Sequence, residues 1–141
     1  KSDYDLQSAL KILPDNSNIL NYLAYSWLER DINISKSVSM LELAYEKDDK
    51  SPYIIDSIGW AYYLINRFEE AEILLRKAII LMPNDPIVND HYGDILWSLN
   101  RKIEAKYYWN SVLNFKNADE EMKKKIKNKL LLGTSKKNEN L

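Results

Sequence analysis

Apolar residues recur three or four positions apart along most of the chain, which is the spacing of one buried helix face. Between Pro52 and Asp85 this pattern predicts two helices that share a buried face. The large residues of that face are Ile55, Ile58, Tyr62, Phe68, Leu75 and Ile79. The same spacing predicts further helices near 17–30, 34–48 and 118–132.

The segment 52–85 repeats itself thirty-four residues later in the chain. Gly59 returns as Gly93, and Ala71 returns as Ala105. A glycine inside a helix costs about 1 kcal/mol relative to alanine, so two glycines one period apart indicate a point where helices approach closely. A period of this length with small residues at fixed offsets is the signature of a helical solenoid.

The run from Ile58 to Tyr62, followed by Phe68, Ala71, Ala78 and Pro83, resembles the tetratricopeptide repeat, TPR below. The resemblance implies an all-α, right-handed solenoid of helical hairpins that holds partner proteins. We expect one domain over 1–133. Its expected parts are the second helix of a truncated upstream repeat (1–16), three repeats (17–51, 52–85 and 86–117) and a capping helix (118–133), followed by a disordered polar tail (134–141).

Two departures from the regular repeat lead to further expectations. The step from Ala24 to Ser37 is thirteen residues rather than twelve, which predicts a one-residue insertion in the first turn. The orphan first helix would leave Leu6, Leu10 and Leu13 partly uncovered, so we expect self-association through the N-terminal end. The runs around these repeats also resemble the C-terminal end of long, multi-repeat bacterial proteins, many of them exported to the cell envelope.

Composition and charge exclude several classes of function. The chain has 141 residues, a net charge of −1 and no cysteine, so we expect no nucleic-acid partner and no thiol chemistry. No apolar run approaches the roughly 20 residues that span a bilayer, so we expect no direct membrane insertion. The compartment stays open.

Candidate chemistry is sparse. His91 is the single histidine, and we expect it to pack near a turn or to bond to a neighbouring helix. Asp56 and Asp90 lie one period apart and could form a carboxylate pair in an enzyme or a carbohydrate-binding module. Their places in first helical turns favour interaction with helix N-terminal amides instead. We therefore predict no catalytic residue, cofactor or metal.

The TPR resemblance implies that the first helix of each repeat lines a concave groove. The residues expected there are Asn21, Tyr25, Tyr53, Asp56, Trp60, Tyr63, Asp90, Asp94 and Trp97. Helical geometry puts the same residues on shared stripes. The groove lacks the lysine and arginine of the TPR variant that clamps a C-terminal carboxylate.

Aspartates and aromatic rings instead favour a basic or aromatic partner segment. The sequence thus indicates a non-catalytic protein-interaction scaffold. Alternatives are the aspartate-based enzyme or carbohydrate-binding module, and a purely self-assembling solenoid. The lysine run from Lys123 to Lys129 is expected to form the solvated outer face of the last helix.

Overall fold

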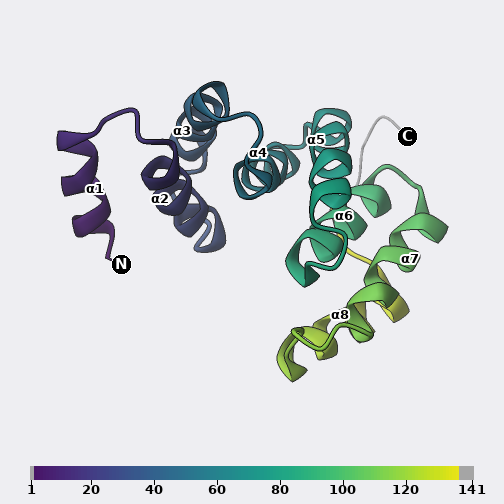
Figure 1. The fold of residues 1–141 in the computed structure, drawn as a ribbon. Helices are drawn as coiled ribbons and strands as arrows, with labels where there is room; N and C mark the ends of the chain where they lie inside the picture. Colours follow the sequence, from purple (N-terminus) through teal and green to yellow (C-terminus); the bar gives the residue numbers. More distant parts are fainter. Residues whose placement is uncertain (1, 137–141) are drawn as a thin grey trace.

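The computed structural model describes residues 2–136, and these form eight α-helices and no strand. The helices are α1 (Asp3–Ile12), α2 (Ser17–Glu29), α3 (Ile34–Lys47), α4 (Pro52–Leu64), α5 (Phe68–Leu81), α6 (Pro86–Ser98), α7 (Lys102–Leu113) and α8 (Glu120–Leu132). Between α1 and α8, successive helices pair into three hairpins that follow one another in an arc (Figure 1). The predicted all-α class and hairpin order are confirmed.

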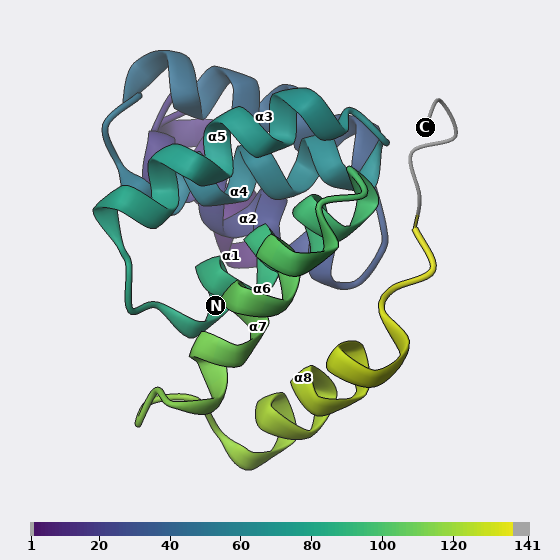
Figure 2. The same cartoon turned by 90° about the vertical axis from the view of Figure 1, so that its right-hand side faces the viewer.

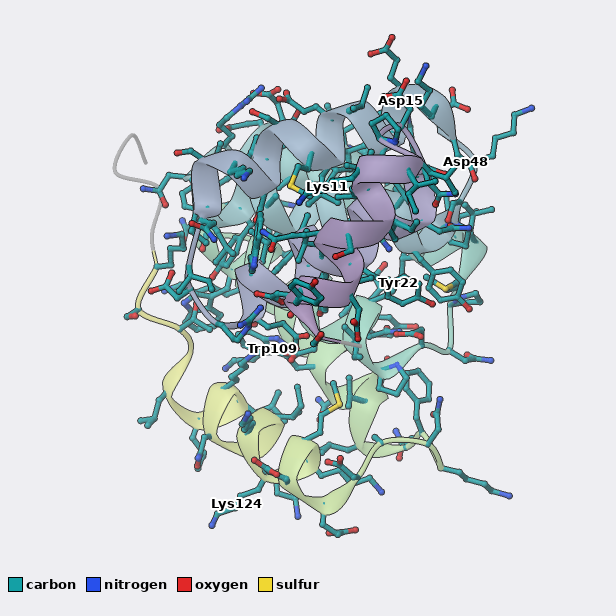
Figure 3. The ribbon with its side chains drawn as sticks, turned by 90° about the vertical axis from the view of Figure 1, so that its left-hand side faces the viewer. Lys11, Asp15, Tyr22, Asp48, Trp109 and Lys124 are labelled. Atoms are coloured by element: carbon teal, nitrogen blue, oxygen red, sulfur yellow. The ribbon has the colours of Figure 1, made fainter. Side chains whose placement is uncertain are left out.

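The hairpins form two layers. Besides packing on its neighbours in sequence, α2 packs against α4, and α4 packs against α6. Helices that meet across hairpins lie on the shorter, inner side of a curved stack. The concave face is therefore built by α2, α4 and α6, and the outer layer by α3, α5 and α7. The loops that follow α1 and α3 lie side by side at one end, where Asp15 and Asp48 mark them in Figure 3.

Short polar caps start the inner helices. The side chains of Asn16, Ser51 and Asp85 accept hydrogen bonds from backbone N–H groups three residues on, at 3.0, 3.5 and 3.0 Å. A proline follows two of these caps, at the first helical position, where its missing N–H leaves no bond unmade. Helix α8 is capped by Asp119, whose side chain accepts a hydrogen bond from Met122 N at 2.8 Å.

The turn of the first hairpin differs from the other two. Asn66 and Asn100 each adopt a positive φ, of 66° and 62°, as the single left-handed residue of their turns. The first turn contains two such residues, Asp31 and Asn33, with φ of 56° and 50°. Asparagine and aspartate tolerate this conformation better than other non-glycine residues. The extra left-handed residue accommodates the longer spacing between Ala24 and Ser37.

Close helix approach occurs where the repeated glycines lie. A Cβ on Gly59 would lie 2.2 Å from Leu75 Cδ2, and a Cβ on Gly93 would lie 2.3 Å from Trp109 Nε1. Leu75 and Trp109 are both fully buried. The second and third hairpins therefore use the missing side chain of this glycine as the space that their second helix fills.

The two end helices are anchored less deeply than the hairpins. In α1 only Leu6 is buried, against Leu23 and Trp27, while Leu13 is exposed, so the three leucines of this segment are not all covered, as expected. Ile12 and Leu13 remain exposed, and self-association through this end stays a prediction.

Helix α8 packs against α7 through the fully buried Ile126, while Lys124 points away from the body (Figure 3). The tail predicted to be disordered begins with residues 134–136, which lie close to α6: the Ser98 hydroxyl donates to the Lys136 carbonyl at 2.6 Å. Residues 137–141 lie outside the described part of the chain.

Substituting Gly93→Ala should destabilise the fold by about 1–3 kcal/mol, although alanine is the better helix former. The added methyl group overlaps the indole of Trp109, which has no free space to move into. Urea unfolding would measure the change. The exposed Asn110→Ala, one residue from Trp109, is the control and should change stability little. A Gly93→Ala protein more stable than wild type would contradict this account.

Candidate functional site

The concave face contains an open pocket of about 270 Å³ among α2, α4 and α6. Four of the nine residues predicted for the groove line it: Asn21, Tyr25, Tyr53 and Asp56. The sequence reasoning missed its other lining residues, which are Asn18, Tyr22, Ser57, Met82, Asp85, Ile87 and Val88. The repeat itself carried a signal for two of them, because Asn18 and Ile87 occupy the same repeat position as Tyr53, which was predicted.

One polar group in this pocket has no partner. Asn21 Oδ1 is buried and makes no hydrogen bond with the described residues. A buried polar atom without a partner costs about 1–3 kcal/mol. Around it, Tyr22 and Tyr53 line the pocket and are about two-thirds exposed. The pocket thus combines an apolar rim with one unsatisfied amide.

The centre of the face is closed by a buried ion pair. His91 Nδ1 lies 2.9 Å from Asp56 Oδ1, which joins α6 to α4. The imidazole also stacks on the Trp60 indole, with ring centres 3.9 Å apart and planes at 15°, and Trp60 stacks on Tyr63 at 4.6 Å. The expectation that His91 bonds to a neighbouring helix is confirmed. Tyr63 is buried and does not line the open pocket, whereas Asp56, which is also largely buried, does line it.

The environment of His91 favours its charged form. Burial lowers the pKa of the imidazole, but the charge and hydrogen bond of Asp56, with Asp90 and Asp94 further off, outweigh burial and raise the pKa above 6.5. In its charged form, His91 compensates the carboxylate of Asp56.

At the C-terminal end of the face, Lys129 of α8 bridges two carboxylates of α6. Its ammonium lies 2.7 Å from Asp90 Oδ1 and 2.9 Å from Asp94 Oδ1. Asp94 also accepts a hydrogen bond from Trp109 Nε1 at 3.1 Å. Burial and the neighbouring charge of Asp90 raise the pKa of Asp94 to about 6, although Lys129 acts in the opposite direction. The prediction that the whole lysine run is solvated is wrong for Lys129.

Asp56 and Asp90 form neither a free carboxylate pair nor bonds to helix N-terminal amides, the two alternatives that the sequence suggested. Asp56 and Asp90 bind His91 and Lys129, whereas the N-terminal amides of their helices are capped by Ser51 and Asp85. Interaction with helix amides, the preferred interpretation, is wrong, and neither carboxylate is free of a cation. Within residues 2–136 no group of three metal-ligating side chains gathers, and no helix has the length and apolarity to cross a bilayer.

A curved stack of helical hairpins whose inner helices carry aromatic, amide and acidic side chains defines a helical-repeat scaffold. No protein-family model matches the chain. Over 90 residues, 64% of its length, it is 31% identical to a TPR repeat-containing protein of Pseudomonas aeruginosa. The chain spans only 15% of the length of that relative.

Two solved structures support the same class. A thermophilic TPR protein of Thermus thermophilus matches 92% of this chain and 72% of its own, at 18% identity and a TM-score of 0.75. The first TPR of Spaghetti, bound to an HSP90 peptide, matches 80% of this chain and 89% of its own, at 16% identity and a TM-score of 0.67. With the repeat pattern, these findings show that the chain has the TPR fold, and proteins with this fold are generally non-catalytic and typically bind proteins or peptides.

Substituting Asp56→Asn should lower the pKa of His91 below 6.5, because burial then outweighs the remaining charges. A raised folded-state pKa stabilises the protein fully below pH 6.5, and that contribution is lost as the pH rises through the folded-state value. The stability advantage of wild type over the variant should therefore shrink at high pH. The pKa of His91 can be measured by NMR titration, because the chain has a single histidine and its ring signals overlap with those of no other histidine.

The exposed Asp15→Asn is the control for this titration, and its His91 pKa should match that of wild type. An unchanged pKa in the Asp56→Asn protein would show that the ion pair does not set the charge of His91.

Proposed function

We propose that the chain is a non-catalytic scaffold that holds an extended segment of a partner protein in the open part of its concave face. The observation that carries the proposal is the unpartnered amide of Asn21 inside an apolar pocket. An extended segment presents free backbone N–H and C=O groups along its length. A backbone N–H of the segment can donate a hydrogen bond to Asn21 Oδ1 while the neighbouring side chains of the segment contact Tyr22, Tyr25 and Tyr53.

The charge around this pocket favours a basic segment. A second hollow of about 310 Å³ adjoins the first, since Tyr25 and Ile87 line both. Its charged lining residues are Glu29, Asp90, Asp119, Glu121, His91 and Lys125, so carboxylates outnumber cations. A lysine or arginine of the segment would meet these carboxylates, although exposed pairs contribute only about 0–1 kcal/mol each. The tyrosines must therefore supply most of the affinity, as aromatic anchors do at other interfaces.

The resemblance in fold to a TPR bound to an HSP90 peptide supports the mode of binding rather than the ligand. The open pocket here contains the carboxylates of Asp56 and Asp85 and no basic side chain among its lining residues. An acidic peptide would meet repulsion in such a pocket, and a basic peptide would meet attraction.

Substituting Tyr53→Ala should weaken binding at least tenfold, because it removes an exposed ring from the pocket. The ligand would be the tightest-binding peptide selected by wild-type protein from a random twelve-residue phage library, with affinity measured by calorimetry. Asn21→Ala should weaken the binding of the same peptide by a smaller factor than Tyr53→Ala does.

Tyr107→Ala on outer helix α7 is the matched control, since Tyr107 is 67% exposed and Tyr53 is 66% exposed. Selected peptides that bind Tyr53→Ala as tightly as wild type, or that lose affinity only with Tyr107→Ala, would contradict the proposed groove.

A further inference from the structure

The C-terminal part of the concave face is covered by the chain itself. After the Lys129 contact with Asp90 and Asp94, α8 ends at Leu132, and the chain then runs back along the hairpins (Figure 2). The cap residue Gly133 has a φ of 71°. Gly133 passes directly over Trp97 of α6: a Cβ there would lie 2.1 Å from Trp97 Cζ2. Only glycine combines this backbone conformation with this approach.

The next three residues continue along the same face. The Lys136 carbonyl accepts from the Ser98 hydroxyl of α6, and the Lys136 ammonium lies 5.7 Å from the centre of the Tyr63 ring of α4. A cation over an aromatic face is attracted by the ring quadrupole. Two lysines of one segment therefore make an ion-pair contact and a ring contact on two inner helices. We call residues 120–136 the C-terminal strap.

The strap has few fully buried apolar side chains, although the partly buried Met122 and Leu130 also pack against the core. Ile126 is the one fully buried side chain among the residues of α8, and Leu131 and Leu132 are each 83% exposed. By contrast, most residues of α4 and α6 are buried. Segments with little buried apolar surface open locally at a small fraction of the global unfolding free energy. The strap is thus the part of the groove that opens most easily.

Opening the strap would uncover a site that consists of two carboxylates beside an indole ring. Asp90 and Asp94 would lose their shared ammonium, and Trp97 would lose the backbone that covers it. Burial and mutual repulsion already disfavour the charge on Asp94 while Lys129 is bound. Two close carboxylates beside an indole favour a replacement that carries a lysine or arginine.

We propose that the C-terminal strap is autoinhibitory, and that a lysine-bearing segment of a partner protein displaces it from Asp90, Asp94 and Trp97. The strap, as part of the same chain, makes the contacts with Asp90, Asp94 and Trp97 that the segment of the partner protein makes once it has displaced the strap. The inference does not rest on the ligand proposed for the open pocket, because it concerns the other end of the concave face and different side chains.

The test uses the full chain and a fluorescein-labelled synthetic peptide with the sequence of residues 120–136, followed by fluorescence anisotropy. Gly133→Ala and Lys129→Met each weaken the strap while leaving the groove side chains intact. Both variants should bind the peptide at least tenfold more tightly than wild type. Lys127→Met removes an exposed lysine of the same helix and should bind as wild type does.

Two further arms make the result specific. Adding Asp90→Asn and Asp94→Asn to the Gly133→Ala protein should abolish the gain, and so should a peptide with methionine at the place of Lys129. Hydrogen exchange of residues 120–136 in wild type should accelerate at least tenfold on adding the unmodified peptide.

Equal peptide affinity for wild type, Gly133→Ala and Lys129→Met would overturn the proposal, and so would strap exchange that the peptide leaves unchanged. Both readouts are independent of Tyr53, so failure here leaves the proposed function of the open pocket standing, and the reverse also holds.

Discussion

The close approach of the two helices within each hairpin is the constraint on which the rest of the structure depends. Leu75 fills the space that a side chain on Gly59 would take, and Trp109 does the same beside Gly93. These contacts fix how each inner helix sits on its outer partner, and the inner helices then meet across hairpins. The contact at Gly93 also reaches the concave face, since the same indole donates its N–H to Asp94. Hairpin packing thereby determines where a groove carboxylate lies.

The charges of the concave face connect elements that are distant in sequence. Asp56 of α4 binds His91 of α6, and two carboxylates of α6 bind Lys129 of α8. In a repeat protein each unit contacts mainly its neighbours, so such pairs act at the interfaces between units. A buried ion pair contributes little net stability, yet removing one partner is strongly destabilising. We infer that these pairs disfavour wrong stacking, because a shifted hairpin would leave a charge without its partner.

The sequence predicted the fold well because its signals are local. A thirty-four-residue period, small residues at fixed offsets and the caps Ser51 and Asp85 each act within one hairpin.

Side-chain partners across hairpins were not predictable in the same way. The period places Asp56 and His91 on one face, but the bond between them depends on the spacing of two hairpins. Among five lysines of one helix, composition cannot identify the inward one, although Lys129 lies beside the stripe of Ile126. The open pocket was predicted in part. Of the three equivalent repeat positions Asn18, Tyr53 and Ile87, which all line the pocket, the sequence analysis recognised only Tyr53.

The two parts of the concave face make different demands on a bound segment. The open part offers aromatic surface and an unsatisfied amide at Asn21, so a segment gains free energy there without displacing anything. In the covered part the carboxylates already have Lys129, so a segment gains only the difference between its own contacts and those of the strap. Apparent affinity falls by the fraction of molecules whose site is open. A partner long enough to reach both parts would thus be anchored by the tyrosines first. Its lysine would then compete with Lys129 at a high local concentration, because the second contact has become intramolecular.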